Sequence, residues 1–117
     1  MKISNIILFS AIFCVTQVAY SANNPDASTA ALVEICQNPN DQDAQNFCFG
    51  FGEGVYQSYL ANRSPNQRSR ICFDRSENSR EMILQKFLQW HQANPQFDSE
   101  RAAKTLIRFF SQTYPCK

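Results

Sequence analysis

The chain has 117 residues, with 11 Lys and Arg against 10 Asp and Glu, and 5 cysteines. A chain of this length forms one small domain, and a formal net charge of +1 gives no sign of binding to nucleic acid or to a membrane surface. Such a domain buries only about two-thirds of its unfolded surface, so covalent crosslinks would add much to its stability.

Residues 1–21 have the three zones of a secretory signal peptide. Lys2 precedes an apolar core over residues 6–15, which is too short for a stable membrane anchor. Small residues precede a cleavage point between Ser21 and Ala22. We therefore expect an exported protein whose mature domain spans residues 22–117 and keeps no membrane anchor.

The mature chain has an even number of cysteines, which in an exported protein predicts two disulfides. Structural zinc usually needs ligand pairs as close as C-x-x-C, and no two cysteines here are that close. A reactive cysteine would need an unpaired thiol, which an even count does not provide. We expect no metal and no cofactor, and disulfides among Cys36, Cys48, Cys72 and Cys116.

The first half of the mature chain predicts two helices. Asp26 can cap a short helix that ends at the turn over residues 38–40, and Asp43 can cap a longer one. The longer helix is apolar on several faces, so we expect it to be central in the fold. Its apolar residues are Ala44, Phe47, Phe49, Phe51, Val55, Tyr56, Tyr59 and Leu60.

Three glycines interrupt this longer helix: Gly50, Gly52 and Gly54. Each destabilises a helix interior by up to about 1 kcal/mol relative to alanine. Gly50 and Gly54 share a face, so we expect another helix or the N-terminal segment to approach closely there. A glycine loop that binds phosphate is disfavoured, because no strand precedes it.

The second half predicts two more helices at helical spacing. Asn78, with Glu81 three residues later, can cap the first of them, and Asp98 can cap the last. The first carries Ile83, Leu84, Phe87, Leu88, Trp90 and His91; the last carries Ala103, Leu106, Ile107, Phe110 and Tyr114 and ends before Pro115. The expected fold is all-α, a small four-helix bundle braced by disulfides.

The order of these helices favours one of the three possible cysteine pairings. The turn between the first two helices brings Cys36 near Cys48. The last two helices, joined by a short turn, form an antiparallel hairpin that brings Cys72 near Cys116. We expect these two disulfides.

The sequence does not predict a catalytic site. Hydrolysis usually needs a nucleophile with a base, or two carboxylates with different pKa values, and the mature chain offers scattered acids and one histidine, His91. An enzyme would have to pair His91 with a nearby acid. Trp90 and the phenylalanines recur at helical spacing, which favours a core over a ligand pocket.

Residues 61–70 have no apolar periodicity and contain three arginines without an acid: Arg63, Arg68 and Arg70. This pattern predicts an exposed basic loop. Arginine forms bidentate hydrogen bonds with carboxylates, so the loop is our candidate for binding an acidic protein surface. A solvated loop without a partner is the alternative interpretation.

Four segments between Cys48 and Cys116 form a set: residues 48–55, of the form C-x-G-[YF]-x-x-G-V; Ile71-Cys72; residues 90–95, similar to Y-L-x-x-H-P; and Tyr114-Pro115-Cys116, similar to F-P-C. In their order and spacing, these segments resemble the Rap/Tai family of small periplasmic immunity proteins associated with type VI secretion. Asn94 departs from the family's usual histidine, and Phe73-Asp74 follow Cys72 where a proline is usually nearby.

The resemblance implies a helical periplasmic protein that often dimerises. It also implies a partner, a toxic effector such as a peptidoglycan amidase, whose active site the protein blocks without being an enzyme. The matching residues are cysteines, glycines and packing positions, so they do not locate the binding surface. Two other interpretations fit a small exported helical protein: an acid-activated chaperone and a general envelope scaffold.

Overall fold

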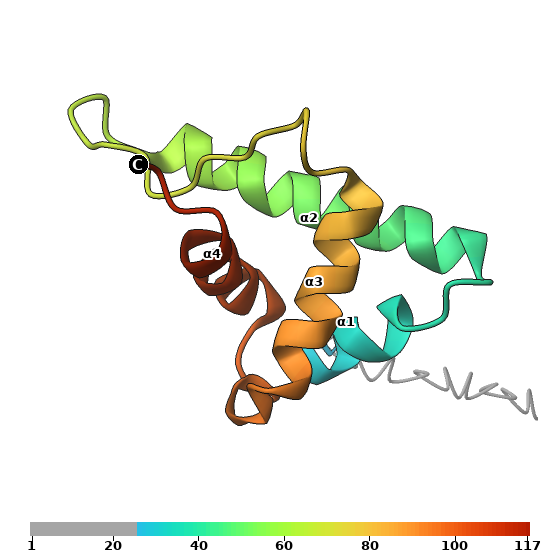
Figure 1. Ribbon diagram of the computed structural model, residues 1–117. Helices are drawn as coiled ribbons and strands as arrows, with labels where there is room; N and C mark the ends of the chain where they lie inside the picture. The colour runs from blue at the N-terminus through green and yellow to red at the C-terminus, as the bar shows by residue number, and fades with distance from the viewer. Residues whose placement is uncertain (1–25) are drawn as a thin grey trace, which may run out of the picture.

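The computed structural model describes residues 26–117, so the expected signal peptide lies outside the described residues. Four α-helices, with one 3-10 turn before the last, make up the fold in Figure 1. No strand occurs within residues 26–117, which confirms the expected all-α class. None of the helices described could cross a membrane. The elements are α1 (Thr29–Cys36), α2 (Gln42–Asn62), α3 (Arg80–Gln92), η1 (Pro95–Phe97) and α4 (Ala102–Thr113).

Each of the first three helices begins at a side chain that caps it. The caps are Ser28, Asp41 and Ser79, whose side-chain oxygens accept hydrogen bonds from the backbone N–H groups three residues later. The sequence predicts caps at Asp26, Asp43, Asn78 and Asp98; the first three are displaced, and no side chain caps α4. Every helix start here offers two or more capping residues within a few positions, and local sequence does not rank them.

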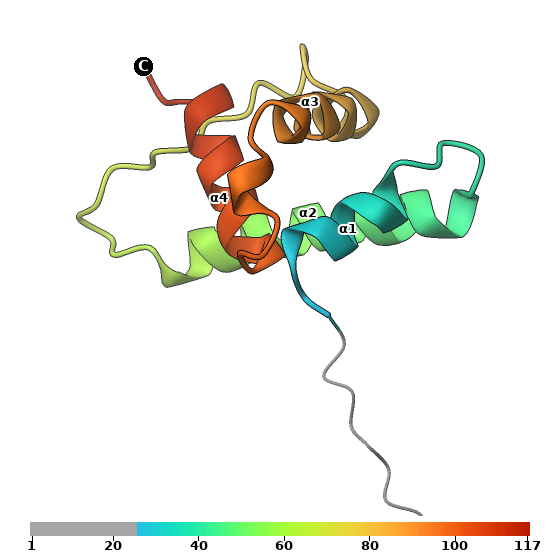
Figure 2. The ribbon, with the colours of Figure 1, turned by 90° about the horizontal axis from the view of Figure 1, so that it is seen from below.

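Helices α1 and α2 run antiparallel and side by side (Figure 2). The Cys36–Cys48 disulfide joins the end of α1 to the first turns of α2. The buried Gln45 amide closes the turn between them by donating to the carbonyl oxygens of Cys36 and Asn38, both at 2.9 Å. The predicted pairing of these two cysteines is confirmed.

Helices α3 and α4 cross steeply and do not form the predicted antiparallel hairpin. Figure 1 shows α4 nearly end-on while α3 lies along the page, and Figure 2 shows the reverse. The connection between them is held by the start of α1, where Ala30 N–H donates to the carbonyl of Asp98 at 3.0 Å. Cys72 and Cys116 nevertheless form the predicted disulfide, because Cys72 N–H donates to the Tyr114 carbonyl at 2.8 Å.

The last helix contributes more to the core than any other helix described. Its buried residues are Ala102, Thr105, Leu106, Phe109 and Phe110. The predicted stripe is partly confirmed: Leu106, Phe110 and Tyr114 are buried, but Ala103 is exposed and Ile107 only half-buried. The buried face is completed instead by Ala102, Thr105 and Phe109. Both stripes have helical spacing, and burial of the polar Thr105 against α1 decides between them.

Helix α2 contacts each of the other helices but is not buried on several faces. Only Gln45 and Cys48 are buried in it, and Phe47 remains 51% exposed. The close approach predicted at Gly50 and Gly54 is wrong, because a Cβ atom built at either glycine would meet nothing within 4 Å. Within residues 26–117, no atom packs closely against these two glycines.

A polar cluster joins the start of α1 to α4. The hydroxyl of Thr29 donates to Thr105 Oγ1 at 2.7 Å, in a position where both residues are fully buried. Thr105 donates in turn to a carboxylate oxygen of Glu100, which also pairs with Lys104 and Arg108, both at 3.3 Å. Partial burial alone would raise the pKa of Glu100, but these hydrogen bonds and the charge of Arg108 outweigh it and lower the pKa.

This cluster predicts a loss of stability in acid. The folded pKa of Glu100 lies below the ordinary value of 4.5, so its contribution is present above that pH and is lost as the pH falls through the folded pKa. We expect Glu100→Gln to lower the urea midpoint at pH 7 and to lower it much less at pH 3. An equal loss at both pH values would show that the charge of Glu100 contributes nothing.

Candidate functional site

The basic loop predicted over residues 61–70 projects from the body of the fold between α2 and the chain that leads to α3 (Figure 2). Both ends of the loop are fixed. Arg63 N–H donates to the Leu60 carbonyl at the end of α2, and Ile71 is 1% exposed and belongs to the core. The loop is therefore a protrusion on a rigid base.

The three arginines of this loop are not equivalent. Arg63 folds inward, since its Nη1 donates to the Gln67 carbonyl at 2.7 Å and its Nε is buried. Arg68 and Arg70 are exposed. Arg70 uses its backbone N–H, which donates to the Tyr59 hydroxyl at 2.8 Å, to hold the loop. Only Arg68 and Arg70 therefore have guanidinium groups that can reach a partner.

A pocket of about 350 Å³, which the sequence does not predict, lies between α2 and α3. Its walls are mostly apolar and come from every helix described. Phe73, from the chain before α3, packs edge-on against Tyr56 and Phe110 at centroid distances of 4.8 and 5.1 Å. Leu84 and Phe87 of α3, both buried, form another part of the wall.

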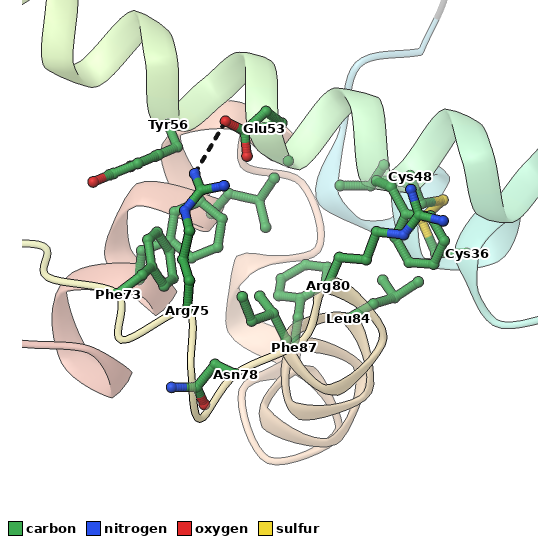
Figure 3. Close-up of a pocket in the computed structure, with 16 residues that line it drawn as sticks. Cys36, Cys48, Glu53, Tyr56, Phe73, Arg75, Asn78, Arg80, Leu84 and Phe87 are labelled. Atoms are coloured by element: carbon green, nitrogen blue, oxygen red, sulfur yellow. Dashed lines mark hydrogen bonds and ion pairs between the residues drawn. A yellow bond between two sulfur atoms is a disulfide. The ribbon is translucent and has the colours of Figure 1, made fainter.

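Charged side chains surround the mouth of this pocket (Figure 3). Arg75 reaches across from the chain before α3 and pairs with Glu53 of α2, with 3.3 Å between Nη2 and Oε1. Arg80, near the Cys36–Cys48 end, places its guanidinium over the ring of Phe49, 4.5 Å from the centroid. Two arginines and one glutamate therefore line the opening.

Sequence periodicity could not reveal this pocket. Arg75 lies outside any helix, and Arg80 opens α3. Gly52, the middle glycine of α2, is one of the residues that line the pocket. The only feature of the sequence that pointed to the pocket was Gly52 itself, a glycine within a helix whose other residues pack well. Trp90 does not line the pocket. Its ring stacks on Phe97, with 5.6 Å between the centroids, and packs on Phe109.

His91 has the acidic neighbour that catalysis would require, but no nucleophile joins the pair. Its Nε2 contacts Oδ1 of Asp98, across the turn between α3 and α4. Within residues 26–117, no hydrogen bond links His91 to a hydroxyl, and all four cysteines form disulfides. Asp98 thus braces a turn and does not cap a helix. No group of three or more potential metal ligands occurs in the part of the chain that the structure describes.

Comparison with known proteins identifies one family. The sequence profile of a family described as Rap1a immunity proteins matches residues 28–116. This range includes all four helices and both disulfides. No curated protein and no solved structure matches the chain.

Proposed function

The chain belongs to the family of Rap1a immunity proteins, and we propose on this basis that it binds one secreted toxic effector and inhibits it. The match over residues 28–116 carries this proposal, because it spans the entire fold and not an isolated motif. At a finer level, we propose that the effector is a peptidoglycan amidase delivered by type VI secretion. The resemblance of residues 48–116 to the Rap/Tai pattern supports that target.

We place the encounter in the periplasm. Two disulfides support this location, because such bonds form and persist in oxidising compartments. The signal-peptide pattern of residues 1–21 points the same way. The protein acts by occupying the effector's surface as a stoichiometric inhibitor, and we propose that it is not an enzyme.

The basic loop is a suitable element for contact with the effector. Arg68 and Arg70 stand on a protrusion with fixed ends, which limits the backbone entropy lost when they bind. Exposed cations steer association toward an acidic surface and make it depend on salt. We propose that these two arginines face a carboxylate at or beside the effector's active site.

To test the function, the tagged protein is recovered from the envelope fraction of its host under non-reducing conditions, and its partners are identified by mass spectrometry. We expect one stoichiometric hydrolase, whose activity falls when the purified protein is added. The double variant Arg68→Glu/Arg70→Glu should bind it about tenfold more weakly or worse, mainly through slower association.

Arg101→Glu is the control for reversing the charge of one exposed arginine elsewhere, because the Arg101 side chain makes no hydrogen bond or ion pair within residues 26–117. It should bind like the wild type. Recovery of the protein without a partner, or with many unfolded clients after acid treatment, would contradict the immunity function and favour the scaffold or chaperone interpretation. If the double variant binds as tightly as the wild type, only the proposed contact between the basic loop and the effector is contradicted.

A further inference from the structure

The pocket between α2 and α3 has the size and lining of a site for one apolar group. Its volume of about 350 Å³ lies at the lower end of the range of roughly 300–1,000 Å³ that is common for ligand sites. Its floor includes side chains at the centre of the core, Leu84, Phe87, Leu106 and Phe110. A group that enters the pocket therefore rests directly on the hydrophobic core.

The charges at the mouth favour a carboxylate beside that apolar group. Arg75 and Arg80 are 70% and 65% exposed in their ion pairs with Glu53 and Glu81. Exposed pairs of this kind contribute little to stability, so either arginine can exchange its partner at low free-energy cost. Glu81 pairs with Arg80 but does not line the pocket, so the charged side chains that line the opening are two arginines and one glutamate.

We propose that this pocket receives an apolar, preferably aromatic, side chain of the effector, whose neighbouring carboxylate binds Arg75 or Arg80. The inference rests on the proposed function. A protein segment supplies both groups on adjacent residues, and interface energy commonly concentrates in a single anchor that fills a desolvated pocket. The arginine loop and the pocket would then contact the effector at two separate places.

Gly52 offers a direct way to fill the pocket. It lines the cavity, and a Cβ atom there would meet nothing within 4 Å, so Gly52→Leu places a side chain in the pocket without displacing backbone. Gly50→Leu is the matched control. Two residues apart on a helix are separated by about 200°, and Gly50 is exposed and does not line the pocket. Both variants remove a helix glycine, so both should melt at or above the wild-type temperature.

The pocket is tested first with defined probes. The full mature protein is titrated with N-acetyl-Asp-Phe-amide while backbone amide shifts are followed by NMR, and N-acetyl-Asp-Ala-amide and N-acetyl-Lys-Phe-amide serve as comparisons. We expect saturable shifts at Gly52, Phe73 and Arg75 with the first peptide, and at least about tenfold weaker binding of the others. Gly52→Leu should abolish these shifts and Gly50→Leu should preserve them.

The same variants are then tested against the hydrolase recovered from the envelope. Gly52→Leu should bind it at least about tenfold more weakly than Gly50→Leu. Arg75→Glu, compared with Arg101→Glu, provides a second test if Gly52→Leu does not fold.

Three results would overturn the proposal while the immunity function stands. They are equal binding of the hydrolase by Gly52→Leu and Gly50→Leu, binding of decanoate in the pocket without competition from the hydrolase, and a change of oligomeric state in Gly52→Leu alone. If no hydrolase is recovered, the proposed function fails, and the peptide titration alone decides whether the pocket takes an aromatic group beside a carboxylate.

Discussion

Replacing Phe109 with alanine should lower the free energy of unfolding by about 3–5 kcal/mol, the usual range for removing a buried phenylalanine side chain. Phe109 is 1% exposed and packs against the rings of Phe87, Trp90, Phe110 and Tyr114 at centroid distances of 5.4 to 6.0 Å. The substitution leaves a cavity where α3, α4 and the C-terminal segment meet. Urea denaturation followed by circular dichroism measures the loss.

Phe47→Ala is the matched control for this prediction, because Phe47 is the same residue type, lies in a helix and is 51% exposed. Surface substitutions usually change stability by less than about 0.5 kcal/mol. We expect a difference of several kcal/mol between the two variants. Similar losses in both would show that α2 has a partner at Phe47 in solution, such as a second copy of the chain.

The second large effect is expected at the disulfide between Cys72 and Cys116. It closes a loop with a sequence separation of 44, for which restriction of the unfolded chain gives about 4 kcal/mol. Since small domains have total stabilities of about 5–15 kcal/mol, the double variant Cys72→Ala/Cys116→Ala should be marginally folded. Its unfolding is measured in urea under oxidising conditions, so that Cys36–Cys48 remains closed.

Limited reduction provides an independent check of this disulfide. Cys72 is exposed, whereas Cys36 and Cys48 are 1% and 6% exposed. A thiol reductant should therefore open Cys72–Cys116 first, because exchange needs access to a sulfur atom. Mass spectrometry after alkylation distinguishes the two bonds. Earlier opening of Cys36–Cys48 would contradict the burial of that bond in the hydrophobic core.

The disulfides also explain why the candidate site stays in place on a small domain. Cys72–Cys116 fixes the end of the basic loop to the C-terminal segment, and Cys36–Cys48 lines one side of the pocket. Phe73 and Arg75 lie within three residues of Cys72, which the disulfide holds in place. Both surfaces that we assign to the effector are therefore attached to crosslinked parts of the chain, which lowers the entropy lost on binding.

The helices and the cysteine pairing follow from sequence because they depend on residue spacing and on the order of the helices along the chain. Apolar residues at intervals of three and four define each helix, and the order of helices brings each pair of cysteines together. The helix starts did not follow, since capping residues such as Asp41 and Asp43 compete within a few positions. The predicted hairpin gave the correct Cys72–Cys116 bond although α3 and α4 cross steeply. Chain connectivity brings the two ends of this segment together at more than one crossing angle of the helices.

The sequence by itself determined an all-α domain, two disulfides and an exposed arginine loop. Only the tertiary structure decided which face of each helix is buried. It turned Arg63 inward, paired Glu53 with Arg75 across a sequence separation of 22, and placed Gly52 at a pocket formed by all four helices. Such features depend on the packing of elements distant in the chain, and helical periodicity carries no information about which neighbour each face will meet.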